Sequence, residues 1–266
     1  MRVPRLYLPV PLATGMTLPL NENAFNHAVR VLRLKPDAPL TLFNGQGGTF
    51  AAKLLEVSKR EAWVQVTSAL PGEAESPLQV TLAQGISRGE KMDYTLQKAV
   101  ELGVAAIQPL FAKRSGVDLA GERLIRKIQH WRGIVIGACE QCGRNQLPEL
   151  REPLPLIQWL AQLNGSFPPP RKGGLKEEGE AIEEDVQECL RLLLDPLAKQ
   201  GLRRLEPPTG TVTLLIGPEG GLSPAEIAQA HRTGFTGIRL GPRVLRTETA
   251  GVAALAALQA LWGDWD

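Results

Sequence analysis

The chain contains 266 residues, a length that suits two modest domains or one large one. Hydrophobic residues make up 43% of the sequence and charged residues 22%, which excludes a chain that is disordered throughout, and no apolar run approaches the roughly 20 residues of a membrane span. The formal net charge of +2 does not by itself indicate a nucleic-acid partner, although the first 35 residues carry five basic groups and one acidic group.

Residues 1–72 predict a small β-rich domain. Apolar and polar residues alternate there with the period of a strand, and Asn44-Gly45 is a strong signal for a hairpin turn. The predicted elements are a helix over residues 22–32 and strands over residues 40–43, 49–57 and 61–66. Residues 71–77 are polar and bounded by Pro71 and Pro77, so we expect a linker over residues 73–78.

Residues 79–266 predict an α/β domain with a mostly parallel sheet. Short apolar runs alternate with segments of helical period, an order typical of parallel strands joined by helices. Predicted strands cover residues 80–83, 106–111, 190–194, 212–216 and 237–240, and predicted helices cover residues 89–102 and 122–142 or begin at Ser223 and Thr247. Residues 165–188 have too few apolar side chains to pack, so we expect a flexible insertion.

A glycine-rich loop follows the predicted strand that ends at Ile216. Its three glycines, within residues 217–221, would let the backbone approach a ligand, and Ser223 and Glu226 have the spacing of a capping box that starts a helix. The loop lacks the Lys-Ser/Thr of a P-loop and the spacing of a dinucleotide fingerprint. From this loop alone, two other roles are not excluded: a turn needed only for packing, and a phosphate site at the helix start.

A second loop follows the predicted strand that ends at Leu240. It contains Arg243, Arg246 and Glu248 ahead of an Ala- and Leu-rich helix, and such side chains are costly to bury unpaired, so we expect them to face a cleft or each other. A purely structural role for Glu248 at the helix start stays open. Both loops follow carboxyl ends of strands, where open α/β sheets bind ligands, and together they predict a binding site.

The cysteines indicate neither a disulfide framework nor a metal site. There are three, and the C-x-x-C pair of Cys139 and Cys142 lies late in a predicted helix without a second pair of ligands. Sparse cysteines suit a reducing compartment, and the N-terminal segment lacks the apolar run of a secretory signal. We therefore expect a cytoplasmic protein without bound metal or membrane association.

The two loops closely resemble those of the RsmE family, whose members methylate a uridine base in 16S ribosomal RNA. Four further segments agree with that family in order and spacing, so the resemblance spans nearly the whole chain. They are Met1-Arg2-Val3-Pro4-Arg5, Ser87-Arg88-Gly89-Glu90-Lys91-Met92, Gln97-Lys98-Ala99-Val100-Glu101-Leu102-Gly103 and Ala138-Cys139-Glu140-Gln141-Cys142-Gly143-Arg144-Asn145.

The resemblance implies a methyltransferase of the SPOUT superfamily. The expected fold is an α/β domain whose mostly parallel sheet, flanked by helices, carries a deep trefoil knot that holds S-adenosylmethionine (SAM), preceded by a small PUA-like β-barrel domain for RNA binding. The expected target is N3 of a uridine in 16S ribosomal RNA, within the small ribosomal subunit or its precursor. A homodimer is also implied, and we expect the helix over residues 249–261 to supply part of its surface.

The resemblance also suggests roles for individual residues. Arg246 is expected to stabilise the developing uridine anion, while Glu248 accepts or relays the proton or orients Arg246. The cofactor is expected to contact Leu194, Ile216, Gly217, Gly220, Leu240, Gly241 and Leu245, with Thr249 nearby. The candidates for RNA contacts are Arg5, Arg30, Arg33, Arg88, Lys91, Glu140, Gln141 and Arg144.

Two related functions remain as alternatives. One is a SPOUT RNA methyltransferase that modifies a different nucleotide, and the other is an RNA-binding relative that has lost catalysis. The intact glycine loop and the Arg246-Thr247-Glu248 segment argue against the inactive relative.

Overall fold

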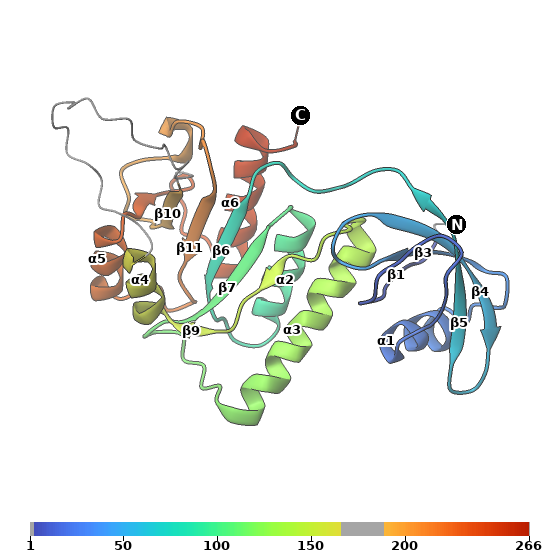
Figure 1. Cartoon of the computed structure of the whole chain (residues 1–266). Coiled ribbons are helices and arrows are strands. Elements are labelled where there is room, and N and C mark those ends of the chain that lie inside the picture. The colour runs from blue at the N-terminus through green and yellow to red at the C-terminus, as the bar shows by residue number, and fades with distance from the viewer. Residues whose placement is uncertain (1–2, 166–188, 266) are drawn as a thin grey trace, which may run out of the picture. The chain divides into compact units, whose positions relative to one another are not determined.

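The computed structural model describes residues 3–165 and 189–265 of the chain (Figure 1). These residues form two compact units, the first made of residues 3–75 and 130–148 and the second of residues 76–129, 149–165 and 189–265. The boundary after Glu75 lies inside the segment expected to be a linker. Apart from Gly165, the insertion expected at residues 165–188 lies outside the described residues.

The first unit is built on a five-stranded sheet. Its strands are β1 (Arg5–Tyr7), β2 (Thr17–Pro19), β3 (Pro39–Phe43), β4 (Thr49–Val57) and β5 (Ala62–Leu70), in the order β1-β3-β4-β5-β2. The β1–β3 pair is parallel, and the other three pairs are antiparallel. In β5 the buried residues Ala62, Val64 and Val66 alternate with more exposed neighbours, because successive side chains of a strand point to opposite faces.

A short helix packs against this sheet. The helix α1 (Glu22–Phe25) begins at Asn21, whose side-chain oxygen accepts a hydrogen bond from the Ala24 N–H at 2.9 Å, and it continues as a wider π-helical turn over Asn26–Val31. Phe25 and Ala28 belong to the same core as Leu6, Leu40 and Leu54. The predicted helix and three longer strands are confirmed, whereas β1 and β2 are too short to show a period in sequence.

The second unit contains a seven-stranded sheet in which every pair is parallel. Its strands are β6 (Val80–Gly85), β7 (Ala106–Phe111), β8 (Glu149–Leu150), β9 (Leu154–Pro155), β10 (Leu190–Leu194), β11 (Val212–Ile216) and β12 (Thr236–Ile238). The order is β12-β10-β11-β6-β7-β8, and β9 also pairs with β7. All carboxyl ends therefore meet at one edge of the sheet.

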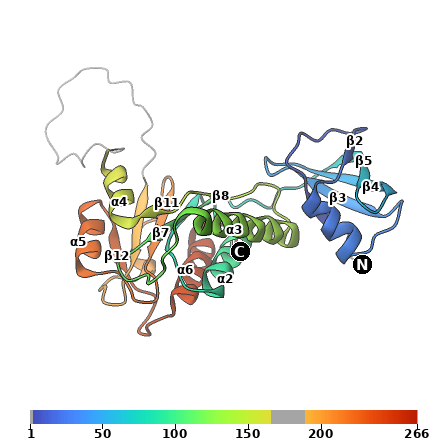
Figure 2. The same ribbon diagram turned by 90° about the horizontal axis from the view of Figure 1, so that it is seen from below.

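Helices cover both faces of this sheet (Figures 1 and 2). The helices α4 (Leu156–Gly165) and α5 (Pro224–Arg232) lie on one face, and α2 (Glu90–Glu101) packs with α6 (Thr247–Trp262) on the other. The helix α3 (Gly121–Cys142) contributes residues up to Gln129 to this unit, and a short 3-10 turn covers Leu202–Arg204. Within the described ranges, no helix is both long enough and apolar enough to cross a membrane.

The segment between β12 and α6 crosses the carboxyl edge of the sheet. The edge strand β12 lies beyond β10, whereas the following helix α6 packs against β6 and β11, so residues 239–246 have to pass the ends of β10 and β11. At the start of this passage the Arg239 N–H donates to the Gln200 carbonyl at 2.9 Å, within the connection from β10 to β11. This course of the chain past its own earlier strands agrees with the expected knotted fold.

The predicted strands and helices of this unit are confirmed to within about two residues, and three elements were missed. The strands β8 and β9 have two residues each, and α4 follows them without a capping signal. The unit division differs from the expected boundary in one respect, because residues 130–148 belong to the first unit. Their side chains bond to that unit: the Glu140 carboxylate, for example, accepts the Tyr7 N–H at 3.0 Å.

The capping box of α5 is confirmed and does more than start the helix. The Glu226 carboxylate accepts hydrogen bonds from the Ser223 N–H at 2.7 Å, from the Ser223 hydroxyl at 2.8 Å and from the Lys113 N–H at 2.7 Å. Glu226 is only 4% exposed. It therefore ties the loop after β7 to the start of α5.

Glu226→Ala is expected to lower the free energy of unfolding by about 3 kcal/mol, because the Ser223 N–H and hydroxyl and the Lys113 N–H lose a charged acceptor. Urea denaturation measures this loss. The control is Glu122→Ala, because the Glu122 side chain is 88% exposed. Its carboxylate makes a long ion pair with the Arg126 guanidinium, at 3.8 Å. Equal stabilities of the two variants would show that the Glu226 hydrogen bonds contribute nothing.

Candidate functional site

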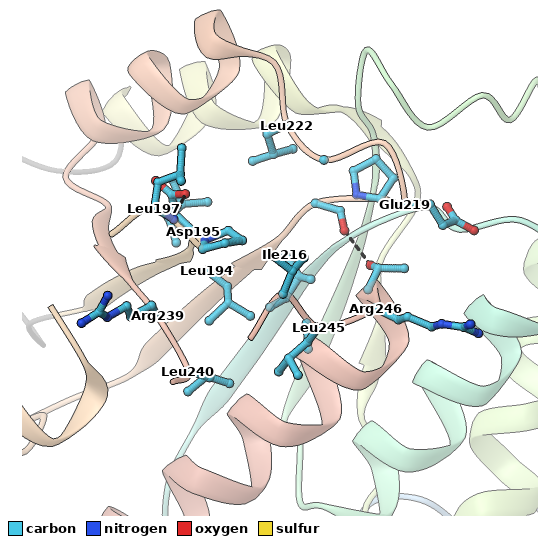
Figure 3. A pocket seen from close by; sticks show the side chains of 18 of the residues that line it. Leu194, Asp195, Leu197, Ile216, Glu219, Leu222, Arg239, Leu240, Leu245 and Arg246 are labelled. Atoms are coloured by element: carbon cyan, nitrogen blue, oxygen red, sulfur yellow. Dashed lines mark hydrogen bonds between the residues drawn. The ribbon is translucent and has the colours of Figure 1, made fainter. Parts of the chain in front are cut away.

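A cavity of about 590 Å³ lies in the second unit at the carboxyl ends of β10, β11 and β12 (Figure 3). Three segments from distant parts of the sequence form it: residues 193–197 after β10, residues 216–222 after β11 and residues 239–250 between β12 and α6. Lys91 of α2 and Ile227 of α5 complete the lining. The two loops singled out in the sequence are therefore brought together, and a third strand end joins them.

Apolar side chains form the floor of the cavity. Leu194, Ile216, Leu240 and Leu245 converge on its centre in Figure 3, and each comes from a strand end or from the segment before α6. Such a surface suits an apolar or aromatic group of a ligand. All four residues were predicted as cofactor contacts.

Glycines allow the loop after β11 to lie close to its neighbours. A side chain at Gly85, the last residue of β6, would place its Cβ 2.6 Å from the Pro218 ring, and one at Gly217 would place it 3.1 Å from the Leu222 nitrogen. Gly241, in the other loop, has a φ of +73°, which disfavours any other residue. Gly217 and Gly241, which were predicted as cofactor contacts, both line the cavity.

Arg246 and Glu248 flank the first residue of α6. Both line the cavity, and the Arg246 side chain lies on the Glu219 side of it, away from Asp195 and Arg239 (Figure 3). The Glu248 Oε2 atom is buried and has no hydrogen-bond partner among the described residues. A buried carboxylate oxygen without a partner is unusual, and it leaves Glu248 able to accept a hydrogen bond from a ligand.

Glu219 links the glycine loop to the start of α2. Its Oε1 atom accepts hydrogen bonds from the Lys91 ammonium and from the Arg88 N–H, each at 3.1 Å. Partial burial favours a higher pKa for Glu219, but these donors, together with its own N–H, outweigh burial and hold the pKa below its ordinary value. The carboxylate is therefore ionised and holds Lys91 at the cavity.

Two predicted cofactor residues do not line the cavity. A Cβ at Gly220 would lie 2.7 Å from the Arg114 carbonyl, so this glycine permits close packing against the loop after β7. Thr249 is exposed on α6 and is also absent from the lining. No pattern in the sequence indicated the contribution of Glu219, although this residue lies between the predicted glycines.

In the first unit, three of the predicted RNA contacts have structural partners. Arg144 is 5% exposed, and its guanidinium bonds the Glu75 carboxylate at 2.6 Å. The Arg5 guanidinium donates to the Asn145 side chain at 2.8 Å, and Glu140 holds the Tyr7 N–H. Burial raises the pKa of Glu140, and the Tyr7 N–H and the nearby His27 only partly offset this effect.

The remaining candidates are accessible to different degrees. Arg30, Arg33 and Gln141 are exposed in the first unit. Arg88 is exposed in the second unit, and Lys91 is half-buried. These five residues can reach a polyanion without first breaking a buried network.

The C-x-x-C pair lies at the end of α3. Cys139 is fully buried, and burial raises the pKa of its thiol to about 12, which leaves little reactive thiolate at neutral pH. Cys139 and Cys142 are free cysteines, and no cluster of three or more potential metal ligands occurs among the residues that the structure describes.

Comparison with known proteins identifies the family. An RNA methyltransferase domain model matches residues 74–259, and an RNA methyltransferase PUA domain model matches residues 20–67. The ribosomal RNA small subunit methyltransferase E of Buchnera aphidicola (subspecies Acyrthosiphon pisum) is 32% identical, over 99% of this chain and 96% of that protein. The corresponding protein of Bacillus subtilis is 27% identical, over 91% of this chain and 89% of that protein.

Solved structures agree with this assignment. A ribosomal RNA small subunit methyltransferase E from Neisseria gonorrhoeae, bound to SAM, matches with 38% identity and a TM-score of 0.88, and a putative methyltransferase from Legionella pneumophila, in complex with SAM, matches with 42% identity and a TM-score of 0.87. Both matches cover 100% of each chain. The expected SPOUT-type fold with its PUA domain is thereby confirmed, and the chain belongs to the ribosomal RNA small subunit methyltransferase E family of RNA methyltransferases.

Proposed function

We propose that this protein transfers the methyl group of SAM to N3 of a uridine in 16S ribosomal RNA, within the small ribosomal subunit or its precursor. The observation that carries this proposal is the position of Arg246 and Glu248, which lie together on the wall of a cavity lined by six of the eight predicted cofactor residues. Family membership and the SAM-bound relatives support the choice of cofactor.

The cavity fits SAM in size and in chemistry. Its volume of about 590 Å³ lies within the range of small-molecule sites. Leu194, Ile216, Leu240 and Leu245 offer apolar surface for the adenine ring, and the backbone at Gly217 and Gly241 offers polar atoms to its edge. The Glu248 Oε2 atom, which has no hydrogen-bond partner among the described residues, is left to accept from the target base rather than from SAM.

Arg246 and Glu248 would have different roles toward the target base. Bound SAM supplies a methyl group on a positively charged sulfonium. Uridine N3 is mostly protonated at neutral pH and is then a poor nucleophile, so the proton has to be removed. Glu248 would accept or relay this proton, and the Arg246 guanidinium would stabilise the negative charge that develops on the base.

The exposed cations provide the proposed RNA contacts. Arg30 and Arg33 in the first unit, and Arg88 and Lys91 in the second, would bind phosphates, while Gln141 would read a base edge. We leave Arg5, Glu140 and Arg144 out of this surface because their polar groups are engaged within the first unit.

We also propose that the protein acts in the cytoplasm as a homodimer that uses α6. Val252, Ala253, Ala256 and Ala257 form a half-buried stripe on this helix, and Leu261 near its end is 41% exposed. Small apolar residues at this spacing let a second helix approach closely.

The test of the function is methyl transfer from radiolabelled SAM to small ribosomal subunits that lack the modification. Nucleoside analysis of the recovered RNA is expected to show N3-methyluridine. A different methylated nucleoside would indicate another target nucleotide. No transfer, with SAM binding retained, would indicate an RNA-binding relative without catalysis.

Glu248→Ala is expected to lower the methyl transfer rate by about 100-fold, because the proton of uridine N3 loses its acceptor. Calorimetry is expected to show SAM affinity within a few-fold of the wild type. A rate equal to that of the wild-type protein at saturating SAM would remove Glu248 from the mechanism.

Gly217→Val or Gly241→Val is expected to abolish measurable SAM binding, since a Cβ at Gly217 would lie 3.1 Å from the Leu222 nitrogen and Gly241 has a positive φ of +73°. Titration calorimetry measures the affinity. The matched control is Gly15→Val, because Gly15 also has a positive φ, +89°, but lies in open space in the first unit. Normal affinity in both cavity variants would refute the placement of the cofactor.

A further inference from the structure

A buried chain of hydrogen bonds joins three elements beside the cavity. The Gln84 Nε2 atom, on β6, donates to the Thr247 hydroxyl at 3.0 Å and to the Gly85 carbonyl at 2.9 Å. The Thr247 hydroxyl, at the start of α6, donates in turn to the Gly217 carbonyl at 2.6 Å, which is the dashed line in Figure 3. Gln84 is fully buried and Thr247 is 7% exposed.

The direction of these hydrogen bonds is determined by their two ends. The Gly85 and Gly217 carbonyls can only accept, so the single hydroxyl proton of Thr247 goes to Gly217 and the amide of Gln84 supplies both of its protons. In this orientation the Gln84 Oε1 atom is buried without a hydrogen-bond partner among the described residues. The Gln84 amide therefore has both N–H groups hydrogen-bonded and its oxygen unpaired.

The start of the glycine loop is held from two sides. The Gly217 carbonyl is bonded to Thr247, and the next residue, Pro218, packs where a Gly85 side chain would approach within 2.6 Å. The helix α6 also packs closely on β6, since a Cβ at Gly251 would lie 3.4 Å from the Gln84 Oε1 atom. Small residues therefore let β6, the loop and α6 approach the same amide.

Thr247 occupies the position between the two proposed catalytic residues. Its hydroxyl bonds the loop, and the helix N-cap Arg246 makes no side-chain capping bond within the described residues, so the place where α6 starts depends on this contact. We infer that Gln84 and Thr247 are positioning residues that set Arg246 and Glu248 relative to the Gly217 loop. This inference rests on the proposed function for the roles of Arg246 and Glu248.

The experiment compares Thr247→Val, which removes the hydroxyl at equal size, with Thr247→Ser, which keeps it. Single-turnover methyl transfer at saturating SAM and ribosomal subunits is expected to slow by about 10- to 100-fold in the valine variant and by less than about threefold in the serine variant. Amide hydrogen exchange over residues 217–222 is expected to accelerate only in the valine variant. SAM affinity by calorimetry is expected to fall less than the rate.

Gln84→Met separates this role from direct contact, since Gln84 does not line the cavity. We expect it to slow the transfer as much as Thr247→Val, and the double variant to be no slower than either, because both changes break one chain of hydrogen bonds. Thr95→Val is the control: Thr95 is 1% exposed, but its hydroxyl donates to the Lys91 carbonyl of its own helix at 2.9 Å.

A folded Thr247→Val variant with the wild-type rate, or a serine variant as slow as the valine variant, would overturn the inference. Independent, additive losses in the double variant would also overturn it. If the wild-type protein transfers no methyl group, the proposed function fails instead, and the hydrogen exchange of the loop in the same variants still tests the contact.

Discussion

The site depends on one constraint, which is that three parallel strands end at the same edge of a sheet although they are far apart in sequence. The ends of β10, β11 and β12 supply Leu194, Ile216 and Leu240 to a single cavity. Only a chain that crosses this edge after β12 can also bring the start of α6 to the cavity. The crossing is therefore the reason that Arg246 and Glu248 lie beside the apolar floor.

Glycines allow the close packing that this arrangement requires. Gly85 and Gly251 leave room for Pro218 and for the Gln84 amide, and Gly220 lets the loop approach the Arg114 carbonyl. A methyl group at any of these positions would meet a neighbour at 3.4 Å or less. The glycines thus serve contacts between elements as much as contacts with a ligand, and polar groups such as Thr247 and Glu226 then fix the elements that have come together.

In the first unit, the segment expected to be a linker makes tertiary contacts. Glu75, within the expected linker, accepts hydrogen bonds from Arg144 and from the N–H groups of Asn145 and Gln146. The Arg144 side chain is only 6% exposed, and breaking a buried ion pair by removing one partner is costly. Residues 143–146 are thereby attached to the β-rich unit, and the charges of Glu75 and Arg144 stabilise the fold.

The sequence by itself determined the longer strands and most of the helices, because strand and helix periods, the Asn44-Gly45 turn and the Ser223–Glu226 capping box are local signals. It also located both loops and most of the cavity lining, through strand ends and the family resemblance. Only the tertiary structure decided that Gly220 packs against Arg114, that Arg144 is buried against Glu75 and that Thr247 bonds the Gly217 carbonyl. These contacts join residues 30 to 106 positions apart, and a pattern read along the chain carries no information about which distant partner will occupy a given side chain.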